Sequence, residues 1–421
     1  MVSKKYTLEE LNINDITFVI PCRNNLSYLQ QAVSSIEEHY GNSTGVVILD
    51  DASDDNSWDW ITQYSESRDN IITYRNDSGD RVGHTVLYDV GFKLAKTPIV
   101  SILHSDMVVT PMYVQNTLKH LTPMSVVSAT RIEPPLHPPG PEKYVRNFGM
   151  EVDEFTNQKD EFLEFVNSKE LIDRDKTSIG IFAPWVMYKE DFTSIGGHDF
   201  LFAPMELEDS DIFNRFHLNE YKLIQSRDAY VYHMTCRGSR FKDGIEIEKE
   251  IPLPDGTIWY KPKDSEEYKQ LRENKFREWW RKWHTDVLHD DNMMPIVPKR
   301  YDTAFVVSNC NTQLLSVLEP WCDTIFVDCE YDAYTSFENP KSEYDISKRV
   351  YSINSDITNN IEIRFDATKL TQQHFTEFIK KLPFIIEETN SIGSFDWDIF
   401  QINIKSLKTI DMIKPHFKNI F

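Results

Sequence analysis

Acidic and polar residues follow short apolar segments in the first quarter of the chain. Asp50 and Asp51 follow the segment GVVIL, and His104, Ser105 and Asp106 follow the segment IVSIL. Hard divalent cations prefer carboxylate oxygens, and such a cation neutralises a diphosphate group. Neither a GxGxxG fingerprint nor a GxxxxGK[ST] loop follows these segments, so a bound nucleotide needs another way to hold its phosphates. The pattern predicts a divalent cation held by carboxylates.

These polar residues need a scaffold that brings the ends of several strands together. Apolar segments alternate with segments that have apolar residues at helical spacing, which is typical of βαβ units around a parallel sheet. Ligands of open α/β sheets bind outside the carboxyl ends of the strands, where the polar residues are expected to lie. The expected elements are strands at 16–21, 45–49, 71–74 and 99–103, and helices at 26–39, 54–64 and 85–96.

The chain is expected to divide into three parts: an α/β domain at 1–245, a Trp-rich helical extension or linker at 246–299, and a second, smaller α/β domain at 300–421. The last part is expected to serve acceptor binding or assembly. Within the first part, residues 131–144 hold five prolines and predict an extended loop. The elements expected in the last part are strands at 304–308, 324–328, 361–365 and 383–386, and helices at 312–318 and 372–382.

The segment 264–288 predicts a helix that carries Trp279, Trp280 and Trp283. Tryptophan and basic residues together are typical of helices that lie on a membrane surface. The acids of this helix nearly balance its bases, however, and packing between two domains explains the tryptophans equally well. We therefore favour packing, with at most peripheral membrane contact.

The composition of the 421 residues is that of a folded protein. A hydrophobic fraction of 40% and an aromatic fraction of 13% exclude intrinsic disorder as the main state. The 45 basic and 67 acidic residues give a formal net charge of −22, which repels nucleic-acid phosphates, so no nucleic-acid partner is expected. No apolar segment approaches the ~18 residues of a membrane-spanning helix. The sequence has five cysteines without a CxxC pair, and its N-terminus lacks the apolar core of a secretory signal. Both features favour a cytoplasmic protein. A homo-oligomer is possible.

Six motifs follow one another between residues 15 and 245: ITFVIPCRN, VVILDDASDDNS, ILHSDM, GGHD, LEDSD and YVYH. In this order the sequence resembles the inverting family 2 glycosyltransferases of the GT-A fold. The resemblance implies a Rossmann-like domain that takes a sugar from a nucleotide-diphosphate sugar, first of all a UDP-linked one. It implies a glycan or another hydroxyl compound as the acceptor, as in polysaccharide biosynthesis.

The resemblance also implies residues that bind the donor. Asp51 takes the place of the acid that reads the nucleotide base, and a carboxylate there can accept a hydrogen bond from uracil N3–H; the alternative is a helix N-cap. Pro21 and Arg23 match the loop that packs on the base and ribose. Ser105, beside the metal motif, is a further candidate. The guanidinium groups of Arg81, Arg237 and Arg240 could bind the diphosphate. Arg237 and Arg240 could equally form a solvated basic loop.

The metal site implied by the resemblance would hold Mn²⁺ or Mg²⁺. Asp106 occupies the metal-binding place of the family's DxD motif, and His233 matches a histidine that often completes the site. His104 replaces the first acid of the motif, which departs from the commonest pattern. His104 can bind the metal, face the sugar or pack.

Catalytic and acceptor residues follow from the same motifs. Inverting transfer needs a carboxylate that takes the proton of the acceptor hydroxyl, and Asp209 matches that base, with Glu208 beside it to orient donor or acceptor. The alternative is that both acids only complement a helix macrodipole. The residues expected near the acceptor are Trp185, Gly197, His198 and Asp199.

Two other classes of protein are kept as alternatives. The first is a sugar-binding or scaffolding protein with a degenerate site, for which the histidine at position 104 is the indication. The second is a nucleotidyltransferase, which would normally have a glycine- and lysine-rich loop after its first strand. The sequence PCRNNLSY lacks such a loop.

Overall fold

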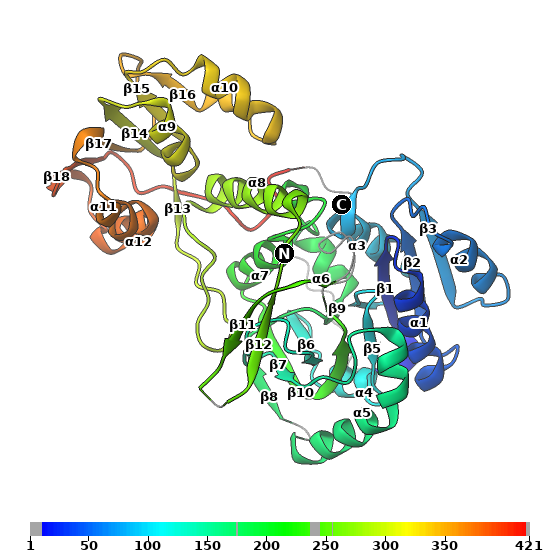
Figure 1. Cartoon of the computed structure of the whole chain (residues 1–421). Helices are drawn as coiled ribbons and strands as arrows, with labels where there is room; N and C mark the ends of the chain where they lie inside the picture. Colours follow the sequence, from blue (N-terminus) through cyan, green and yellow to red (C-terminus); the bar gives the residue numbers. More distant parts are fainter. Residues whose placement is uncertain (1–10, 174–175, 236–244, 255, 418–421) are drawn as a thin grey trace. The chain divides into compact units, whose positions relative to one another are not determined.

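The computed structural model describes residues 11–173, 176–235, 245–254 and 256–417, which form two compact units (Figure 1). The first unit comprises the chain up to Lys269 together with His289–Pro295. The second comprises Gln270–Leu288 and Ile296–Phe417. The boundary falls within helix α8 (Glu266–Trp283). The three-part division expected from the sequence stays a prediction.

A mixed ten-stranded sheet forms the centre of the first unit, in the order β3-β2-β1-β4-β9-β6-β10-β5, with β7 beside β6 and β8 beside β10. The neighbours β3, β2, β1 and β4 run parallel, whereas β9 is antiparallel to both β4 and β6. The strands are β1 (Ile16–Cys22), β2 (Gly45–Asp50), β3 (Ile71–Arg75), β4 (Ile99–Ile102), β5 (Met107–Val109), β6 (Ser125–Glu133), β7 (Lys143–Val145), β8 (Thr177–Ile179), β9 (Trp185–Tyr188) and β10 (Lys222–His233).

Helices cover both faces of this sheet, which explains why β1 is apolar at nearly every position. Phe18 and Ile20 pack in one apolar cluster with Val33 of α1, while Val19 packs in a second cluster with Phe92 of α3. A strand buried on both faces has no polar side. The helices of this unit are α1 (Leu26–Tyr40), α2 (Ser57–Ser65), α3 (Gly83–Leu94), α4 (Tyr113–Leu118), α5 (Val152–Asp173), α6 (Lys189–Ser194) and α7 (Glu208–Leu218).

The expected α/β class is confirmed, with differences in detail. The helix expected from residue 54 begins at Ser57, whose backbone N–H donates to the Asp55 carboxylate 2.8 Å away. The proline-rich segment is a loop only in its middle, because β6 extends to Glu133 and β7 begins at Lys143. A hairpin of β11 (Ile247–Pro252) and β12 (Ile258–Pro262) was not expected in the segment before α8.

The second unit contains a six-stranded sheet in the order β16-β15-β14-β17-β19-β18. The four neighbours β16, β15, β14 and β17 run parallel, and β19 is antiparallel to β17 and β18. The elements are β13 (Arg300–Tyr301), β14 (Thr303–Ser308), α9 (Thr312–Leu318), β15 (Thr324–Val327), α10 (Asp332–Glu338), β16 (Val350–Ser352), β17 (Ile361–Asp366), α11 (Gln372–Glu377), α12 (Leu382–Thr389), β18 (Gly393–Trp397), β19 (Phe400–Ile404) and β20 (Thr409–Ile410).

The strand predicted at 383–386 is wrong, because these residues lie in α12. Pro383 occupies the start of the helix, where the missing N–H costs no hydrogen bond. Leu382 and Ile386 are one helical turn apart and are both buried. A short apolar run is consistent with a strand or a buried helix, and here the helix forms.

The tryptophans of α8 pack within the second unit. Trp280 stacks on Trp321 with a ring separation of 4.9 Å, and Trp279 donates from Nε1 to the carbonyl of Thr285 at 2.8 Å. Trp279 and Trp283 are buried. These rings therefore pack inside a folded unit, whereas the expected packing between two domains stays a prediction. Among the described residues, no helix combines the length and apolarity needed to cross a bilayer.

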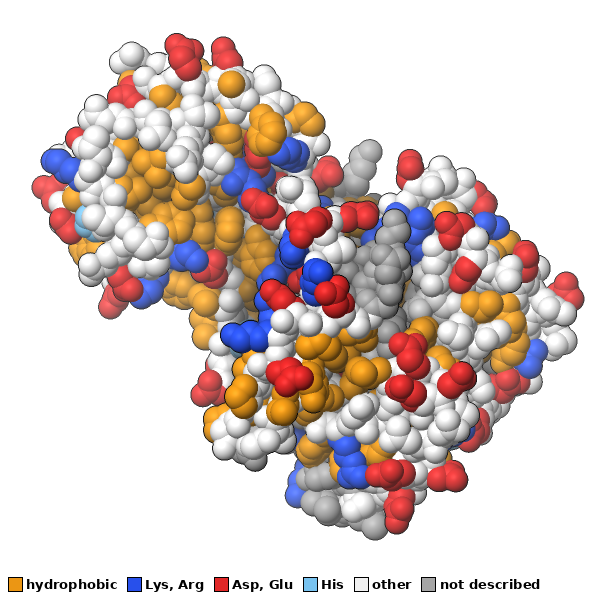
Figure 2. Space-filling view, viewed as in Figure 1, with side chains coloured by type: hydrophobic (Ala, Val, Ile, Leu, Met, Phe, Trp, Pro, Cys, Tyr) orange, Lys and Arg blue, Asp and Glu red, His pale blue; other side chains and the backbone are white. Residues whose placement is uncertain are grey.

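Buried charges lie beside these tryptophans. Glu319 accepts from Arg281 Nη2 at 2.7 Å, from Arg349 Nε at 2.5 Å and from the Tyr334 hydroxyl at 2.9 Å. Glu338 accepts from Arg281 at 2.6 Å as well. On the outside, acidic and basic side chains are interspersed over the face drawn in Figure 2.

Candidate functional site

Three potential metal ligands meet at one edge of the large sheet. His104 and Asp106 lie in the turn between β4 and β5, and His233 is the last residue of β10. The antiparallel register of β10 and β5 sets His233 opposite Met107, which brings it next to Asp106. The ligand atoms of the three side chains all lie within 4.8 Å of one another.

Buried carboxylates orient His233. Its Nδ1 lies 2.8 Å from Glu133 Oε1, and its Nε2 lies 3.4 Å from Asp106 Oδ1. Burial opposes a charged imidazole, but Asp106 and Glu133 outweigh it and raise the pKa of His233 to about 9. The site thus attracts a positive charge. With Nδ1–H donating to Glu133, Nε2 is left for a cation, the arrangement in which a carboxylate orients a metal-binding histidine.

The donor set fits a divalent cation. His104 is kept neutral, because burial and the charge on His233 lower its pKa to about 3. Its ring lies 5.6 Å from that of His233. Two imidazoles and one carboxylate are an ordinary ligand set for a transition-metal ion, whereas Mg²⁺ prefers oxygen ligands alone.

We expect the substitution Glu133→Gln to weaken Mn²⁺ binding by about 10- to 100-fold, because the amide no longer fixes the tautomer and orientation of His233. Titration calorimetry with MnCl₂ measures this loss directly. Glu142→Gln is the matched control. Glu133 pairs with Arg131 at 3.1 Å and with Lys143 at 3.0 Å, and Glu142 pairs with the same two residues at 3.0 and 3.5 Å, but no described contact joins Glu142 to His233. Equal affinities of the two variants would contradict a positioning role for Glu133.

The two candidate catalytic acids begin helix α7. The preceding residues Glu206 and Leu207 both have a left-handed backbone, with φ of 84° and 68°. Such conformations are costly for non-glycine residues and cluster at functional sites. Glu208 is buried, and its Oε1 lies 2.6 Å from His84 Nε2. Asp209 is partly exposed.

The charges of these acids differ although the residues are neighbours. Burial favours the neutral form of Glu208, but His84 outweighs this and lowers its pKa. Burial and the negative charge of Glu208 raise the pKa of Asp209 to about 7. A carboxylate with this pKa can take a proton at neutral pH and hold it.

Helix α3 connects the two groups of residues. His84 reaches Glu208, and its ring lies 6.1 Å from that of His104. The N-terminus of the same helix binds Asp51: the N–H groups of Val82 and Gly83 donate to its two carboxylate oxygens at 3.0 and 2.8 Å. The candidate metal ligands, the α7 acids and Asp51 therefore all lie near the start of one helix.

Gly83 allows this helix start to form. Its φ is +81°, and a Cβ atom would lie 1.9 Å from the carbonyl oxygen of Pro204. Asp51 is also bound by the Asn76 amide at 2.8 Å, so most of its acceptor capacity is used within the chain. The base-reading role of Asp51 stays a prediction.

The other predicted donor residues lie at the same edge. Pro21 is buried in β1, and Arg23 donates to the carbonyls of Asp51 and Ala52. Ser105 accepts from the Asn25 amide at 2.9 Å. Arg81 lies 3.0 Å from the sulfur of Met205, and burial lowers its pKa although Asp51 opposes this. Arg237 and Arg240 lie outside the described residues.

The predicted acceptor residues are not accessible in this structure. Trp185 has no exposed surface and packs against Phe92 and Phe216. His198 is fully buried with Nδ1 2.7 Å from Asp89, and Asp199 is 1% exposed. Gly196 and Gly197 have positive φ values, and this turn leads His198 into the core. Trp185, His198 and Asp199 thus pack in the core, and Gly197 is buried with them. The acceptor contacts expected of these four residues stay a prediction.

Four residues at or beside the site were missed by the sequence analysis: His84, Glu133, Asn76 and Tyr88, whose ring lies 5.8 Å from that of His84. Asn76 follows β3, so the rule that polar residues after strands form the site would have found it. Glu133 belongs to the proline-rich segment, and His84 and Tyr88 lie on a helix whose spacing indicates only an amphipathic core helix.

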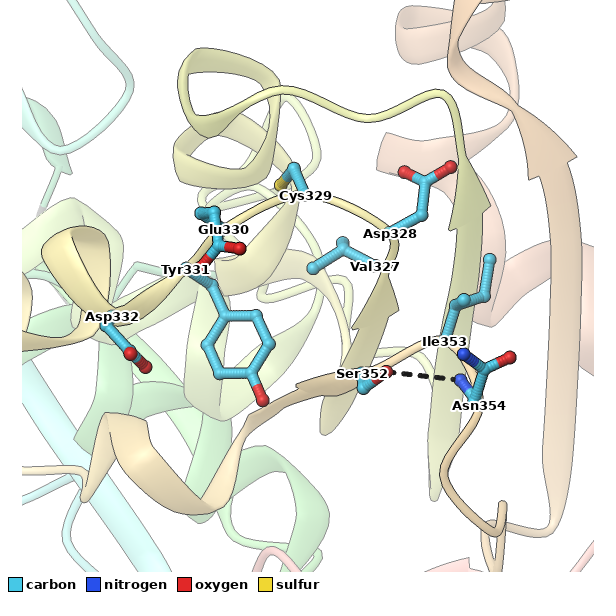
Figure 3. A pocket seen from close by; sticks show the side chains of 9 residues that line it. All are labelled: Val327, Asp328, Cys329, Glu330, Tyr331, Asp332, Ser352, Ile353 and Asn354. Atoms are coloured by element: carbon cyan, nitrogen blue, oxygen red, sulfur yellow. Dashed lines mark hydrogen bonds between the residues drawn. The ribbon is translucent and has the colours of Figure 1, made fainter.

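The second unit has a cavity of its own, with a volume of about 310 Å³. Figure 3 shows it at the carboxyl ends of β15 and β16. Its lining is mostly polar and includes Asp328, Tyr331, Ser352 and Asn354. The backbone N–H groups of Asn309 and Cys310 bind the Asp328 carboxylate at 2.7 and 2.9 Å.

Comparisons with known proteins match parts of the chain. Residues 17–182 match the family model described as Glycosyl transferase family 2. Among solved structures, the one titled "Crystal structure of S. aureus TarS 1-349" is 14% identical, with a TM-score of 0.38, and the match covers 52% of this chain. It spans 60% of that chain, which is less than two thirds. No curated protein matches the sequence.

Proposed function

We propose that this chain is an inverting glycosyltransferase of the GT-A fold, because residues 17–182 match the glycosyl transferase family 2 model and lie in a mixed α/β sheet domain. It moves a sugar from a nucleotide-diphosphate sugar, first of all a UDP-linked one, to a hydroxyl group of a glycan or another acceptor. The family match ends before α7, so the roles of Asp209 and His233 are proposed from the geometry of the site.

In this proposal Asp106, His233 and His104 hold a divalent cation. The mixed imidazole and carboxylate ligands favour Mn²⁺ over Mg²⁺. The cation would neutralise the diphosphate of the donor and so make it a better leaving group. Asp51, with Pro21 and Arg23 nearby, would contact the nucleoside, and Arg81 would add positive charge.

Asp209 acts as the general base. It takes the proton from the acceptor hydroxyl while that oxygen attacks the anomeric carbon from the side opposite the diphosphate. The new glycosidic bond forms as the bond to the diphosphate oxygen breaks, and the anomeric configuration inverts. Glu208, held by His84, keeps a second negative charge beside Asp209 and thereby raises its proton affinity.

One observation supports this proposal above the others: the metal ligands and the acids belong to one continuous group of side chains. Glu208 binds His84 at 2.6 Å, the His84 ring lies 6.1 Å from His104, and the His104 ring lies 5.6 Å from His233. A helix macrodipole would explain acids at the start of α7, but it would not explain a cation site beside them.

The proposal is tested by thermal-shift titration of UDP, GDP, dTDP and CDP, each with and without Mn²⁺. A ligand that binds only the native state, at ~100 times its Kd, stabilises it by ~2.7 kcal/mol. We expect one nucleotide to raise the midpoint temperature of unfolding, and only when Mn²⁺ is present. The variant Asp106→Ala should lose this shift. The control Asp59→Ala, which changes an exposed residue of α2, should keep it. If no nucleotide shifts the midpoint temperature, the proposed transferase activity is contradicted, and a sugar-binding or scaffolding protein is favoured.

A further inference from the structure

Tyr88 of α3 has a buried hydroxyl group without a hydrogen-bond partner among the described residues. The side chain is 1% exposed. Buried hydroxyl groups are nearly always hydrogen-bonded, and leaving one unpaired costs free energy. Tyr88 adds hydrophobic contacts to the core through its ring, which phenylalanine would supply without that cost. The hydroxyl therefore calls for a partner that this structure lacks.

The ring of Tyr88 lies close to residues of both halves of the site. It lies 5.8 Å from the ring of His84, which binds Glu208, and 6.4 Å from the ring of His104, one of the candidate metal ligands. After burial itself, the groups that raise the pKa of Tyr88 are Asp209, Glu208 and Asp106, from both halves. The Tyr88 hydroxyl is therefore close enough to interact electrostatically with the acids of α7 and with Asp106 of the candidate metal site.

A second unpaired atom belongs to Glu208 at the start of α7, which His84 connects to the same group of side chains. Glu208 Oε1 is bound by His84, but Oε2 is buried and has no partner among the described residues. The two unpaired groups are complementary, because a carboxylate only accepts, whereas a phenol both donates and accepts. A sugar hydroxyl placed between them would donate to Glu208 and bond to Tyr88.

We propose that Tyr88, together with Glu208 Oε2, forms a subsite for a hydroxyl group of the donor sugar, and that Tyr88 determines donor specificity. The inference rests on the proposed function. In the proposed function the cation would hold the diphosphate and Asp209 would face the acceptor hydroxyl, so the sugar ring that joins them would lie near both groups, and Tyr88 lies close to both. A site built to bind a sugar hydroxyl discriminates strongly against a deoxy sugar, because the buried polar groups would be left unpaired.

Tyr88→Phe tests this inference, because it removes one oxygen and keeps the ring. The probes are UDP-glucose, UDP-galactose and UDP-N-acetylglucosamine (or the corresponding sugars of the nucleotide selected above) and the free diphosphate, titrated calorimetrically with Mn²⁺. We expect the variant to bind the preferred nucleotide sugar about tenfold more weakly. Its affinity for the free diphosphate should equal that of the wild type.

Tyr113→Phe is the matched control. Tyr113 is also fully buried, but its hydroxyl bonds to that of Ser101 at 2.9 Å in the core cluster of α1 and β1. This variant should bind both probes as the wild type does and should unfold at a lower temperature. Tyr88→Phe should unfold at an equal or higher temperature, because it loses an unpaired buried hydroxyl.

The outcomes separate the two proposals. If the wild type binds a nucleotide sugar and Tyr88→Phe binds it equally well, the subsite is wrong while the transferase stands. Equal losses for the nucleotide sugar and the free diphosphate would also overturn the subsite, because the hydroxyl would then serve the nucleotide. If the wild type binds no nucleotide sugar, the proposed function fails, and the inference fails with it.

Discussion

Replacement of Asp209 by asparagine is expected to lower the turnover by about 10²- to 10⁴-fold, the usual contribution of a general base. Asparagine keeps the shape of the side chain but cannot take the acceptor proton. Donor binding should change little, because the cation site and Asp51 are untouched. The measurement is the release of nucleoside diphosphate from the preferred nucleotide sugar, with an acceptor found on a glycan array.

The pH profile gives this prediction a second readout. A general base acts only when deprotonated, and burial together with Glu208 raises the pKa of Asp209, the proposed base, to about 7. The value of kcat/KM should therefore fall as the pH is lowered through about 7, and the acid limb should vanish in Asp209→Asn. Asp59→Asn, which removes an exposed carboxylate of α2, should retain both the rate and the profile. An Asp209→Asn enzyme with wild-type turnover would assign the base elsewhere.

Replacement of Glu319 by glutamine is expected to destabilise the second unit by about 3–5 kcal/mol, the typical cost of removing one partner from a buried ion pair. Glu319 is 1% exposed and binds both Arg281 and Arg349. Burial opposes the ionised form, but these two guanidinium groups outweigh it and lower the pKa of Glu319. The pKa of a glutamate in an unfolded chain is ~4.3, so the ionised Glu319 contributes its full stabilisation at pH values above ~4.3. This stabilisation is lost as the pH falls through the lower pKa of Glu319 in the folded chain.

Hydrogen exchange of the full chain measures this effect unit by unit. Amides of β14 and β15 should lose protection in Glu319→Gln, while those of β1 and β2 in the first unit serve as the internal reference. The control is Glu387→Gln, because Glu387 pairs with Lys299 at 3.0 Å on the surface and should contribute nothing measurable. Unchanged protection in Glu319→Gln would show that the arginines find other partners, such as Glu338.

The strand-end residues of the site could be predicted from the sequence because the parallel sheet itself collects them. Asp51 and Asp106 follow β2 and β4, and any parallel arrangement of these strands brings their ends to one edge. His233 required more, namely the antiparallel register of β10 with β5, which the family resemblance supplied in place of physical reasoning.

The rest depends on contacts between residues far apart in the chain. His198 pairs with Asp89, 109 positions away, and nothing in the GGHD motif indicates that its histidine turns into the core. His84 and Tyr88 lie one turn apart on α3, a spacing that any amphipathic helix shows. Only the packing of α3 against α7 and the β4–β5 turn reveals their neighbours.

The helix start at Gly83 has a consequence for the evolution of the chain. The backbone N–H groups of residues 82 and 83 bind Asp51 there. The side chain at position 82 can therefore be substituted during evolution without loss of its backbone hydrogen bond to Asp51. Gly83 cannot be substituted in this way, because its φ of +81° and the carbonyl of Pro204 exclude any Cβ atom. Gly79 has a similar φ of +82° but open space around it, and a lineage can replace it at the cost of backbone strain alone. A lineage that loses the glycine at 83 must also rebuild the loop before α7.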